Sequence, residues 1–156
     1  TISDLLPNEV EDLIQQALVL KAGITTRLLE GKIIALIFEK PSLRTRVSFE
    51  VGIRQLGGDT IYLSQQDIAF GKREPVEDSA RVLDRLVDGV VARVFSHRNL
   101  EILAECTTIP VINALSDLAH PCQAIGDMLT ILERKGRLKG LDIAYVGDGN
   151  NIAGSW

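Results

Sequence analysis

The feature that most constrains the fold is the almost unbroken apolar run Lys32–Phe38, which a helical pattern follows closely. A run of this kind, without alternation of polar and apolar residues, is typical of a strand buried on both faces. Beyond it, Val47 and Val51 lie one turn apart on the apolar side of a predicted helix. Pro41 ends the strand, and Ser42 is a residue type that caps helix starts. The sequence therefore predicts a buried strand, a tight loop and a helix that begins near Ser42.

The predicted helix start carries groups that bind anions. The first N–H groups of a helix have no partner inside the helix and lie at the positive end of its dipole. Ser42 and Thr45 add hydroxyl donors, and Arg44 and Arg46 add two positive charges. This combination suits a small anion that bears a phosphate group. Spacing alone leaves an alternative open, in which the two arginines are solvated or paired with acidic side chains.

Composition limits the classes of function. At 156 residues, of which 46% are hydrophobic and 24% charged, the chain is long enough for one globular domain with its own core. Its net charge is −4, so cations that bind an anion must be local, and no nucleic-acid partner is expected. The two cysteines, Cys106 and Cys122, make no disulfide framework, and no run reaches membrane-spanning length. Because no signal-peptide pattern is present either, a cytoplasmic protein without a membrane partner is expected.

Strand and helix patterns alternate along the rest of the chain. Helical spacing predicts helices over 8–21, 76–87, 99–105 and 121–134, and short apolar runs predict strands over 60–63, 89–95, 110–114 and 141–146. Residues 64–75 are polar and contain glycine, so a loop is expected there. This alternation is typical of an α/β fold with a doubly wound parallel sheet flanked by helices. Such sheets bind ligands beyond the carboxyl ends of their strands.

Two sets of polar residues fall at or after the ends of predicted strands. Arg93 interrupts an apolar run, where an unpaired guanidinium is costly, so either a carboxylate or an anionic ligand is expected to meet it. His120 and Gln123 lie together at a predicted helix start. There the helix dipole favours a neutral imidazole, whose N–H group can donate to an oxygen that gains negative charge. A capping or buried structural histidine is the alternative.

The loop Gly147–Asn151 follows the last predicted strand and superficially suggests a dinucleotide-binding loop. It lacks the third spaced glycine of that fingerprint, so the signal is weak. The carboxamides of Asn150 and Asn151 suit an α-amino and an α-carboxylate group. Two further side chains are given no catalytic role, since Cys122 is interpreted as an incidental small residue and His97 as a solvated residue at a helix start.

Three of these segments resemble signatures of one enzyme family. The string over residues 38–50, Phe-Glu-x-Pro-Ser-x-Arg-Thr-Arg-x-Ser-Phe-Glu, resembles the carbamoyl-phosphate signature of the aspartate and ornithine carbamoyltransferase superfamily. His-Pro-x-Gln over residues 120–123, followed by an apolar helix with Asp127, resembles the second signature. The 147–151 loop is similar to the ornithine branch, in which an Asn of this loop recognises the amino-acid substrate. The resemblance spans nearly the whole chain.

The resemblance implies transfer of a carbamoyl group from carbamoyl phosphate to the side-chain amine of L-ornithine, which gives L-citrulline and phosphate in arginine biosynthesis. It implies that the phosphate is held by Ser42, Leu43, Arg44 and Thr45. Arg93 would bridge the phosphate and the carbonyl oxygen, His120 would donate to that oxygen, and Gln123 would hold the carbamoyl amino group. Arg93 and His120 are thus the catalytic candidates, and Asn151 would bind ornithine.

The resemblance also implies how the chain is organised. Residues 1–135 would form a carbamoyl-phosphate-binding domain, and residues 136–156 the first strand and loop of a truncated ornithine-binding domain. Family members form homotrimers through the first domain, and their chemistry needs no metal or other cofactor. Two residues depart from the family pattern, because Leu43 stands where threonine is usual and Ala69 where many relatives carry glutamine. Ala69 precedes the Gly71–Glu74 loop, which in the family reaches a neighbouring subunit's site.

Other functions remain open from the sequence. The acceptor could be aspartate, putrescine or an N-acylated ornithine, as in other branches of the superfamily. The chain could be a non-catalytic anion-binding fragment, which a turnover assay with and without a second half would distinguish. Because of the 147–151 loop, the chain could also be a fragment of a dinucleotide-binding oxidoreductase, and a cofactor titration would test this alternative.

Overall fold

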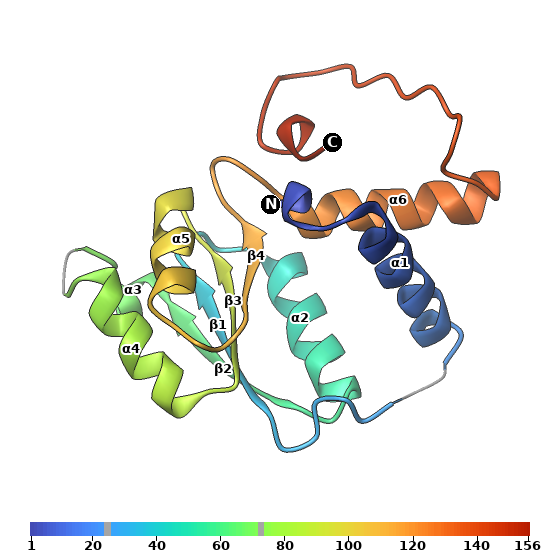
Figure 1. Cartoon of the computed structure of the whole chain (residues 1–156). Helices are drawn as coiled ribbons and strands as arrows, with labels where there is room; N and C mark the ends of the chain where they lie inside the picture. Colours follow the sequence, from blue (N-terminus) through green and yellow to red (C-terminus); the bar gives the residue numbers. More distant parts are fainter. Residues whose placement is uncertain (24–25, 72–73) are drawn as a thin grey trace. The chain divides into compact units, whose positions relative to one another are not determined.

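The computed structural model describes residues 1–23, 26–71 and 74–156 (Figure 1). Contacts divide the chain into two compact units, one formed by Thr25–Asp117 and the other by Thr1–Ile24 together with Leu118–Trp156. The boundary predicted at residue 135 separates the carbamoyl-phosphate-binding domain from the start of the ornithine-binding domain. It is a different division from these two units and stays a prediction. Lys72 and Arg73, in the loop predicted to reach a neighbouring subunit, lie outside the described residues.

A parallel sheet of four strands forms the centre of the Thr25–Asp117 unit. Its strands lie in the spatial order β2-β1-β3-β4, and they are β1 (Ile33–Phe38), β2 (Asp59–Ser64), β3 (Gly89–Arg93) and β4 (Val111–Leu115). β1 pairs with both β2 and β3, and all its residues after Ile33 are buried. The continuous apolar run explains this position, because neither face of a covered parallel sheet meets water. The predicted parallel α/β sheet is confirmed.

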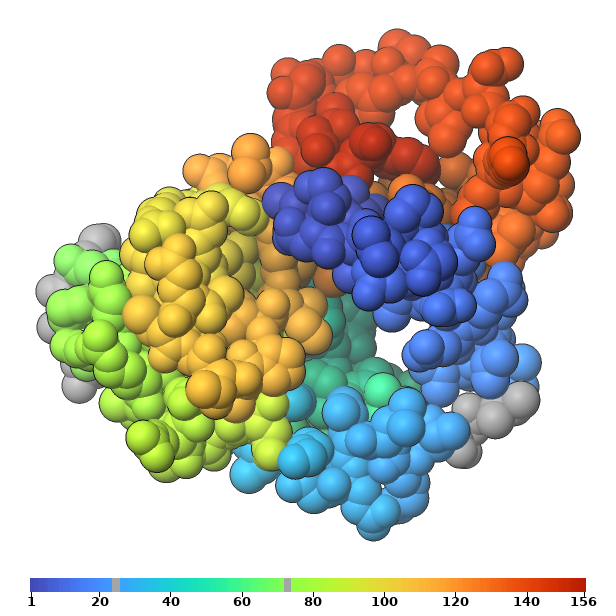
Figure 2. All heavy atoms as spheres, in the orientation of Figure 1, coloured from blue at the N-terminus to red at the C-terminus, as the bar shows by residue number. Residues whose placement is uncertain are grey.

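Helices cover both faces of this sheet (Figure 1). α2 (Leu43–Gln55) lies on one face, where Phe38 belongs to the buried cluster. α4 (Val76–Leu86) and α5 (His97–Glu105) lie on the other face, over a larger cluster that includes Ile37. In the space-filling view, the atoms of α4 and α5 form one continuous layer (Figure 2). Because side chains alternate between the faces of a strand, β1 supplies both clusters.

The direction in which the sheet is built changes between β1 and β3. From β1 the chain passes through α2 to β2 on one side, whereas from β3 it passes through α5 to β4 on the other. The helices of these two connections lie on opposite faces of the sheet (Figure 1). Ligands of doubly wound sheets bind at such a switch point, in the crevice outside the carboxyl ends of the strands. The ends of β1 and β3 are therefore where a ligand of this unit is expected.

The face of α2 that packs on the sheet differs from the sequence prediction. Val47 and Val51, which the spacing assigned to the apolar side, are each 46% exposed. Ile53 is buried in the cluster beneath α2, and Phe49 packs against that cluster. The helix carries apolar residues on two sides, and periodicity alone does not say which side meets the sheet.

The other unit is built on two helices, α1 (Pro7–Lys21) and α6 (Pro121–Lys135), as predicted. Ile14 of α1 is 1% exposed. An ion pair of 2.7 Å between Lys21 and Glu133 joins the carboxyl ends of the two helices. Each helix has a proline in its first turn, where the missing N–H group costs no hydrogen bond. The unit also contains two short 3₁₀ helices, η1 (Ile2–Asp4) and η2 (Ala153–Ser155).

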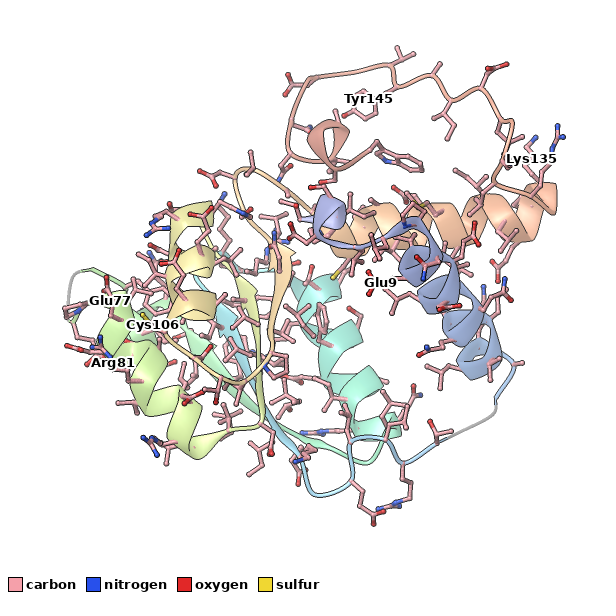
Figure 3. All side chains as sticks on the ribbon, viewed as in Figure 1. Glu9, Glu77, Arg81, Cys106, Lys135 and Tyr145 are labelled. Atoms are coloured by element: carbon pink, nitrogen blue, oxygen red, sulfur yellow. The ribbon has the colours of Figure 1, made fainter. Side chains whose placement is uncertain are left out.

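The predicted strand over 141–146 is wrong, because this segment has no regular secondary structure. Ile143 is 58% exposed and Val146 is 94% exposed. A strand needs a neighbour to satisfy its backbone groups, and the described residues include no strand that pairs with this segment. Tyr145 lies on the open arc of chain after α6, where its hydroxyl donates to Asp148 O at 3.0 Å (Figure 3).

Other differences concern short elements and boundaries. The predicted loop over 64–75 contains a single-turn helix, α3 (Gln65–Ile68), which is too short to show an apolar period. β3 ends at Arg93 instead of residue 95, and α5 begins at His97 instead of residue 99. Within the described part of the chain, no helix combines the length and the apolar character that crossing a membrane requires.

Candidate functional site

The first turn of α2 begins the candidate site, just after the end of β1. Ser42 has an extended backbone with φ of −158° and caps α2 by accepting a hydrogen bond from the Thr45 N–H group at 3.4 Å. Its hydroxyl donates to Thr45 Oγ1 at 2.9 Å. This is the cap that the sequence predicts, and the remaining N–H groups of the first turn have no partner within the helix. The turn therefore offers backbone donors and two hydroxyls at the positive end of a helix dipole.

Arg93 reaches the same turn from the end of β3. Its Nη1 lies 3.5 Å from Thr45 Oγ1, at the limit of a hydrogen bond. Its Nε is buried and has no hydrogen-bond partner among the described residues. Burial lowers the pKa of the Arg93 guanidinium, because its charge is partly removed from water.

Of the two partners that the sequence leaves open for Arg93, the described residues do not supply the carboxylate. No carboxylate of the described residues forms an ion pair with it. An anionic ligand at the first turn of α2 would compensate the charge and satisfy the buried Nε–H group. Arg93 and Thr45 come together at the β1–β3 switch point, so fold and side chains indicate the same place.

The two other phosphate candidates of this turn lie at its surface. Leu43 is 77% exposed, and its apolar side chain has no hydrogen-bond donor, so the polar group that it offers an anion is its backbone N–H. Arg44 is exposed, and its guanidinium forms no ion pair with any other described residue. Its charge is therefore available to a ligand.

Arg46, in contrast, is not available, and the prediction that it adds to the anion-binding charge is wrong. Its Nε donates to Glu50 Oε1 at 2.9 Å, one turn further along α2. Its guanidinium carbon lies 3.6 Å from the centroid of the Tyr62 ring. The hydrogen bond with Glu50 raises the pKa of Arg46 above its usual range. The alternative of an arginine paired with an acidic side chain therefore holds for Arg46 and not for Arg44.

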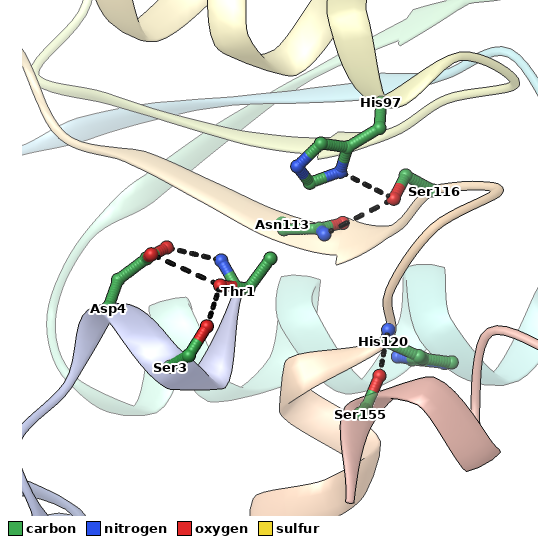
Figure 4. A network of polar contacts seen from close by, with 8 residues as sticks. All are labelled: Thr1, Ser3, Asp4, His97, Asn113, Ser116, His120 and Ser155. Atoms are coloured by element: carbon green, nitrogen blue, oxygen red, sulfur yellow. Dashed lines mark hydrogen bonds and ion pairs between the residues drawn. The ribbon is translucent and has the colours of Figure 1, made fainter.

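The remaining candidates belong to the unit built on α1 and α6. The backbone N–H group of His120 donates to Ser155 Oγ at 2.7 Å (Figure 4), and the Ser155 hydroxyl donates to Asn151 O at 2.6 Å. Ser155, which the sequence analysis does not single out, thus links the His120 and Asn151 segments. Gln123 is exposed, and its Nε2 donates to Asp127 Oδ1 at 2.8 Å on α6.

Two side chains that were given no catalytic role can now be placed. His97 is partly buried instead of solvated, and its ring Nδ1 lies 2.8 Å from Ser116 Oγ (Figure 4). The backbone N–H group of His97 donates to Asp117 Oδ1 at 2.7 Å. Since Asp117 caps α5 from the loop after β4, α5 begins earlier than the spacing suggests. Burial raises the pKa of the Cys122 thiol, which disfavours a thiolate nucleophile.

Glu39 is a feature of this region that the functional part of the sequence analysis misses. It follows β1 directly and is 7% exposed, which is unusual for a carboxylate. The sequence offers two signals, its place in the 38–50 signature and its position immediately after a buried apolar run, and neither of them shows that the side chain is buried.

The described residues include no group of three or more His, Cys, Asp or Glu side chains that could hold a metal ion. They do form a hollow that lies apart from this site. An apolar hollow of about 470 Å³ is lined by residues at the amino ends of β1 and β3, among them Ile34 and Gly89, and by none of the candidate residues.

Comparison with known sequences identifies relatives along the whole chain. Residues 1–133 match the family model of the aspartate/ornithine carbamoyltransferase carbamoyl-P binding domain. An ornithine carbamoyltransferase from Thermococcus kodakarensis is 53% identical over 158 aligned residues, which cover 99% of this chain and 50% of the relative. An anabolic ornithine carbamoyltransferase from Pyrococcus furiosus is 56% identical over 135 residues, covering 86% of this chain and 43% of the relative. The chain spans about half the length of the curated relatives it matches.

Solved structures agree with these relatives. The ornithine carbamoyltransferase of Pyrococcus furiosus has a TM-score of 0.93 and 48% identity, covering 98% of this chain and 50% of that one. The catalytic subunit of an aspartate transcarbamoylase from M. jannaschii has a TM-score of 0.76 and 33% identity, covering 86% of this chain and 46% of that one. The match over residues 1–133, together with these likenesses, means that the chain belongs to the aspartate/ornithine carbamoyltransferase family.

Proposed function

We propose that this chain carries the carbamoyl-phosphate site of an ornithine carbamoyltransferase, an enzyme that transfers a carbamoyl group to the side-chain amine of L-ornithine. The products are L-citrulline and phosphate. The amine attacks the carbonyl carbon, a tetrahedral oxyanion forms, and the bond to the phosphate oxygen breaks. Ornithine is favoured over aspartate as the acceptor because relatives named for ornithine are about 50% identical, against 33% for the aspartate transcarbamoylase.

The observation that carries this proposal is the partly buried guanidinium of Arg93, whose Nε is fully buried. Its Nε lacks a partner among the described residues, and its Nη1 is directed at the hydroxyl of Thr45 in the first turn of α2. A phosphate at this turn would accept from the backbone, from Ser42 and Thr45, and from Arg44 and Arg93. Bridging by Arg93 would also polarise the carbonyl oxygen as it gains negative charge.

The residues of the other unit take the remaining roles in this proposal. His120 donates an N–H group to the carbonyl oxygen, which raises the rate because that oxygen is more negative in the transition state. Gln123 binds the carbamoyl amino group, and Asn151 binds the α-amino or α-carboxylate group of ornithine. Residues 1–135 are proposed as the carbamoyl-phosphate-binding domain and residues 136–156 as the start of the ornithine-binding domain. A cytoplasmic homotrimer, without metal or organic cofactor, completes the proposal.

The chain is expected to bind carbamoyl phosphate but not to form citrulline alone. Its segment 141–146, which leads to the Asn151 loop, has no strand neighbour among the described residues, so no sheet supports the loop that would orient the acceptor. Proximity and orientation supply about 7–11 kcal/mol of a barrier, so a site that holds one reactant falls close to background.

The test is to assay citrulline with this chain alone, and with this chain plus the second half of the Thermococcus kodakarensis relative. Turnover in the mixture only, with ornithine but not with aspartate, is the expected result. Robust turnover by the chain alone would contradict the need for a second half. A chain that neither binds carbamoyl phosphate nor supports turnover in the mixture would contradict the proposed function.

A further inference from the structure

Glu39 is a buried carboxylate that the proposed reaction does not use. It is 7% exposed, and within the described part of the chain no Lys or Arg forms an ion pair with it. Burying a carboxylate without a cation costs free energy that an apolar side chain of similar size would not. Its presence beside the ends of β1 and β3 therefore needs a reason other than the stability of the sheet.

The hydrogen bonds of Glu39 hold the segment that carries Arg93. The backbone N–H group of Glu39 donates to Arg93 O at 2.9 Å. Its Oε2 accepts from the backbone N–H group of Phe95 at 2.7 Å. Lys40, the next residue, adds a second contact to the same segment, since its Nζ lies 4.7 Å from the centroid of the Phe95 ring. Glu39 thus fixes β3 at Arg93 and again two residues later.

The other side of β3 is irregular at the same point. Ala92 pairs with Asn113 of β4, but Arg93 pairs with Leu115, so the register shifts between them. The extra residue lies on β4, and the ladder resumes beyond it, since the Val94 N–H group donates to Leu115 O at 2.9 Å. On the β1 side the pairing of Arg93 runs without such a shift and continues directly into Glu39.

The direction in which Arg93 points is set by the same backbone. Val91, two residues earlier, belongs to the cluster on the α2 face of the sheet. Because side chains alternate along a strand, Arg93 lies on that face too, and its Nη1 reaches Thr45 at the start of α2. A small rotation of the β3 exit would move the guanidinium away from this turn.

We propose that Glu39 is a positioning residue for the anion site, whose carboxylate holds the exit of β3 so that the Arg93 guanidinium faces the first turn of α2. The proposal rests on the proposed function, because it assumes that Arg93 binds phosphate. What matters in it is an acceptor oxygen at the Phe95 N–H group, and the negative charge of Glu39 contributes nothing to binding. The effect of the acceptor oxygen and the effect of the negative charge of Glu39 can therefore be separated by substitution.

Two substitutions make this separation. Glu39→Gln removes the charge but keeps an acceptor oxygen at the same distance along the side chain. Glu39→Asp keeps the charge but withdraws the carboxylate by one methylene group from the Phe95 N–H group. Asp88→Ala is the matched control, because Asp88 Oδ2 accepts from Ile33 N at 2.9 Å and so joins β1 and β3 at their opposite, amino-terminal ends.

The experiment titrates inorganic phosphate into each 156-residue chain by calorimetry and follows thermal unfolding by circular dichroism. Glu39→Asp should weaken phosphate binding about tenfold, as expected for a charge-assisted hydrogen bond that is lost or misaligned. Glu39→Gln should bind no more weakly than the wild type. Asp88→Ala should lower the unfolding temperature and leave the phosphate Kd unchanged.

Several results would overturn the inference. They are a Glu39→Asp chain with wild-type affinity, a Glu39→Gln chain as weak as Glu39→Asp, or an Asp88→Ala chain with an equally weakened Kd. A Glu39→Asp chain that no longer folds would assign Glu39 to the stability of the sheet instead. A wild-type chain that binds no phosphate would contradict the proposed function itself, and this inference with it.

Discussion

Arg44 and Arg46 lie two residues apart on α2 and carry the same charge, yet their surroundings differ. Arg46 is held by Glu50 and by the ring of Tyr62, whereas Arg44 has no ion pair among the described residues. Sequence spacing already differs for the two arginines, since an acidic residue, Glu50, lies one turn after Arg46 and none lies one turn after Arg44. The structure separates them because residues two apart on a helix point to different sides.

This difference predicts the behaviour of two alanine variants. Arg44→Ala should weaken the binding of inorganic phosphate by about 1.5–3 kcal/mol, the range for hydrogen bonds to charged groups. Arg46→Ala serves as the matched control and should leave the phosphate Kd nearly unchanged, because its guanidinium is already engaged. Calorimetry measures both. Equal losses in the two variants would mean that general positive charge, and not Arg44 itself, attracts the anion.

At the scale of secondary-structure elements, the start of α2 has both a structural and a functional role. Ser42 satisfies the Thr45 N–H group and orients the Thr45 hydroxyl that Arg93 approaches. The same side chain thus stabilises the helix and shapes the candidate site.

Ser42→Ala should therefore lower both stability and affinity. Loss of the cap is expected to cost about 1 kcal/mol of the free energy of unfolding, as measured for N-cap serines elsewhere. Ser48→Ala is the control, since the Ser48 hydroxyl only donates to Thr45 O within α2. Urea unfolding gives the first quantity and phosphate titration the second. A Ser42→Ala chain with wild-type values of both would remove Ser42 from the cap and from the site.

The connection before β4 predicts a dependence of stability on pH. Hydrogen bonds, first from the Thr108 N–H group, hold the pKa of Asp84 below its ordinary value of 3.8. A carboxyl group whose pKa is lowered in the folded state stabilises the fold at every pH above its ordinary, unfolded-state pKa. This stabilisation is lost as the pH falls through the lowered pKa of the folded state. Asp84→Ala should therefore destabilise the chain at neutral pH and much less in strong acid.

Urea unfolding of wild type and Asp84→Ala at neutral pH and well below 3.8 measures this dependence. Glu77→Ala, on the same helix α4 (Figure 3), is the control, because Glu77 is only partly buried and forms no ion pair with another described residue. A wild-type-to-variant difference that stays constant with pH would contradict the assignment.

Elements with a strong apolar pattern could be predicted from the sequence, and elements that depend on neighbours could not. The run Lys32–Phe38 and the cap at Ser42 gave β1 and the start of α2 correctly. The segment 141–146 has an apolar pattern as well, but a strand also requires a paired neighbour, and the described residues supply none. Sequence patterns report what a segment prefers, not whether its partner is present.

The candidate site shows the same limit. Ser42, Arg44, Thr45 and Arg93 could be named from motifs and from a charge in an apolar run, and the structure places Thr45 beside Arg93. The face of α2 that meets the sheet could not be predicted, whereas the spacing of Arg46 and Glu50, one helical turn apart, already allowed the pairing that the structure shows. Glu39 was missed because its importance lies in its burial and in the Phe95 N–H group, and neither is visible in the sequence.

At the scale of the whole molecule, the central claim is that topology and charge indicate one place. Chain connections change direction between β1 and β3, and a guanidinium with a buried unpaired Nε lies at the end of β3. Even a partly buried charge without a counter-charge destabilises the fold, so its retention points to a ligand.

The most direct test is a calorimetric titration of carbamoyl phosphate into the wild-type chain and into Arg93→Met, with thermal unfolding of both. Methionine fills much of the space of the arginine without its charge. The wild type should bind at one saturable site, and Arg93→Met about tenfold more weakly or worse. The variant should be at least as stable as the wild type, because a partly buried charge without a counter-charge has been removed. Equal affinity in the two chains would contradict the account, because Arg93 would then hold no anion.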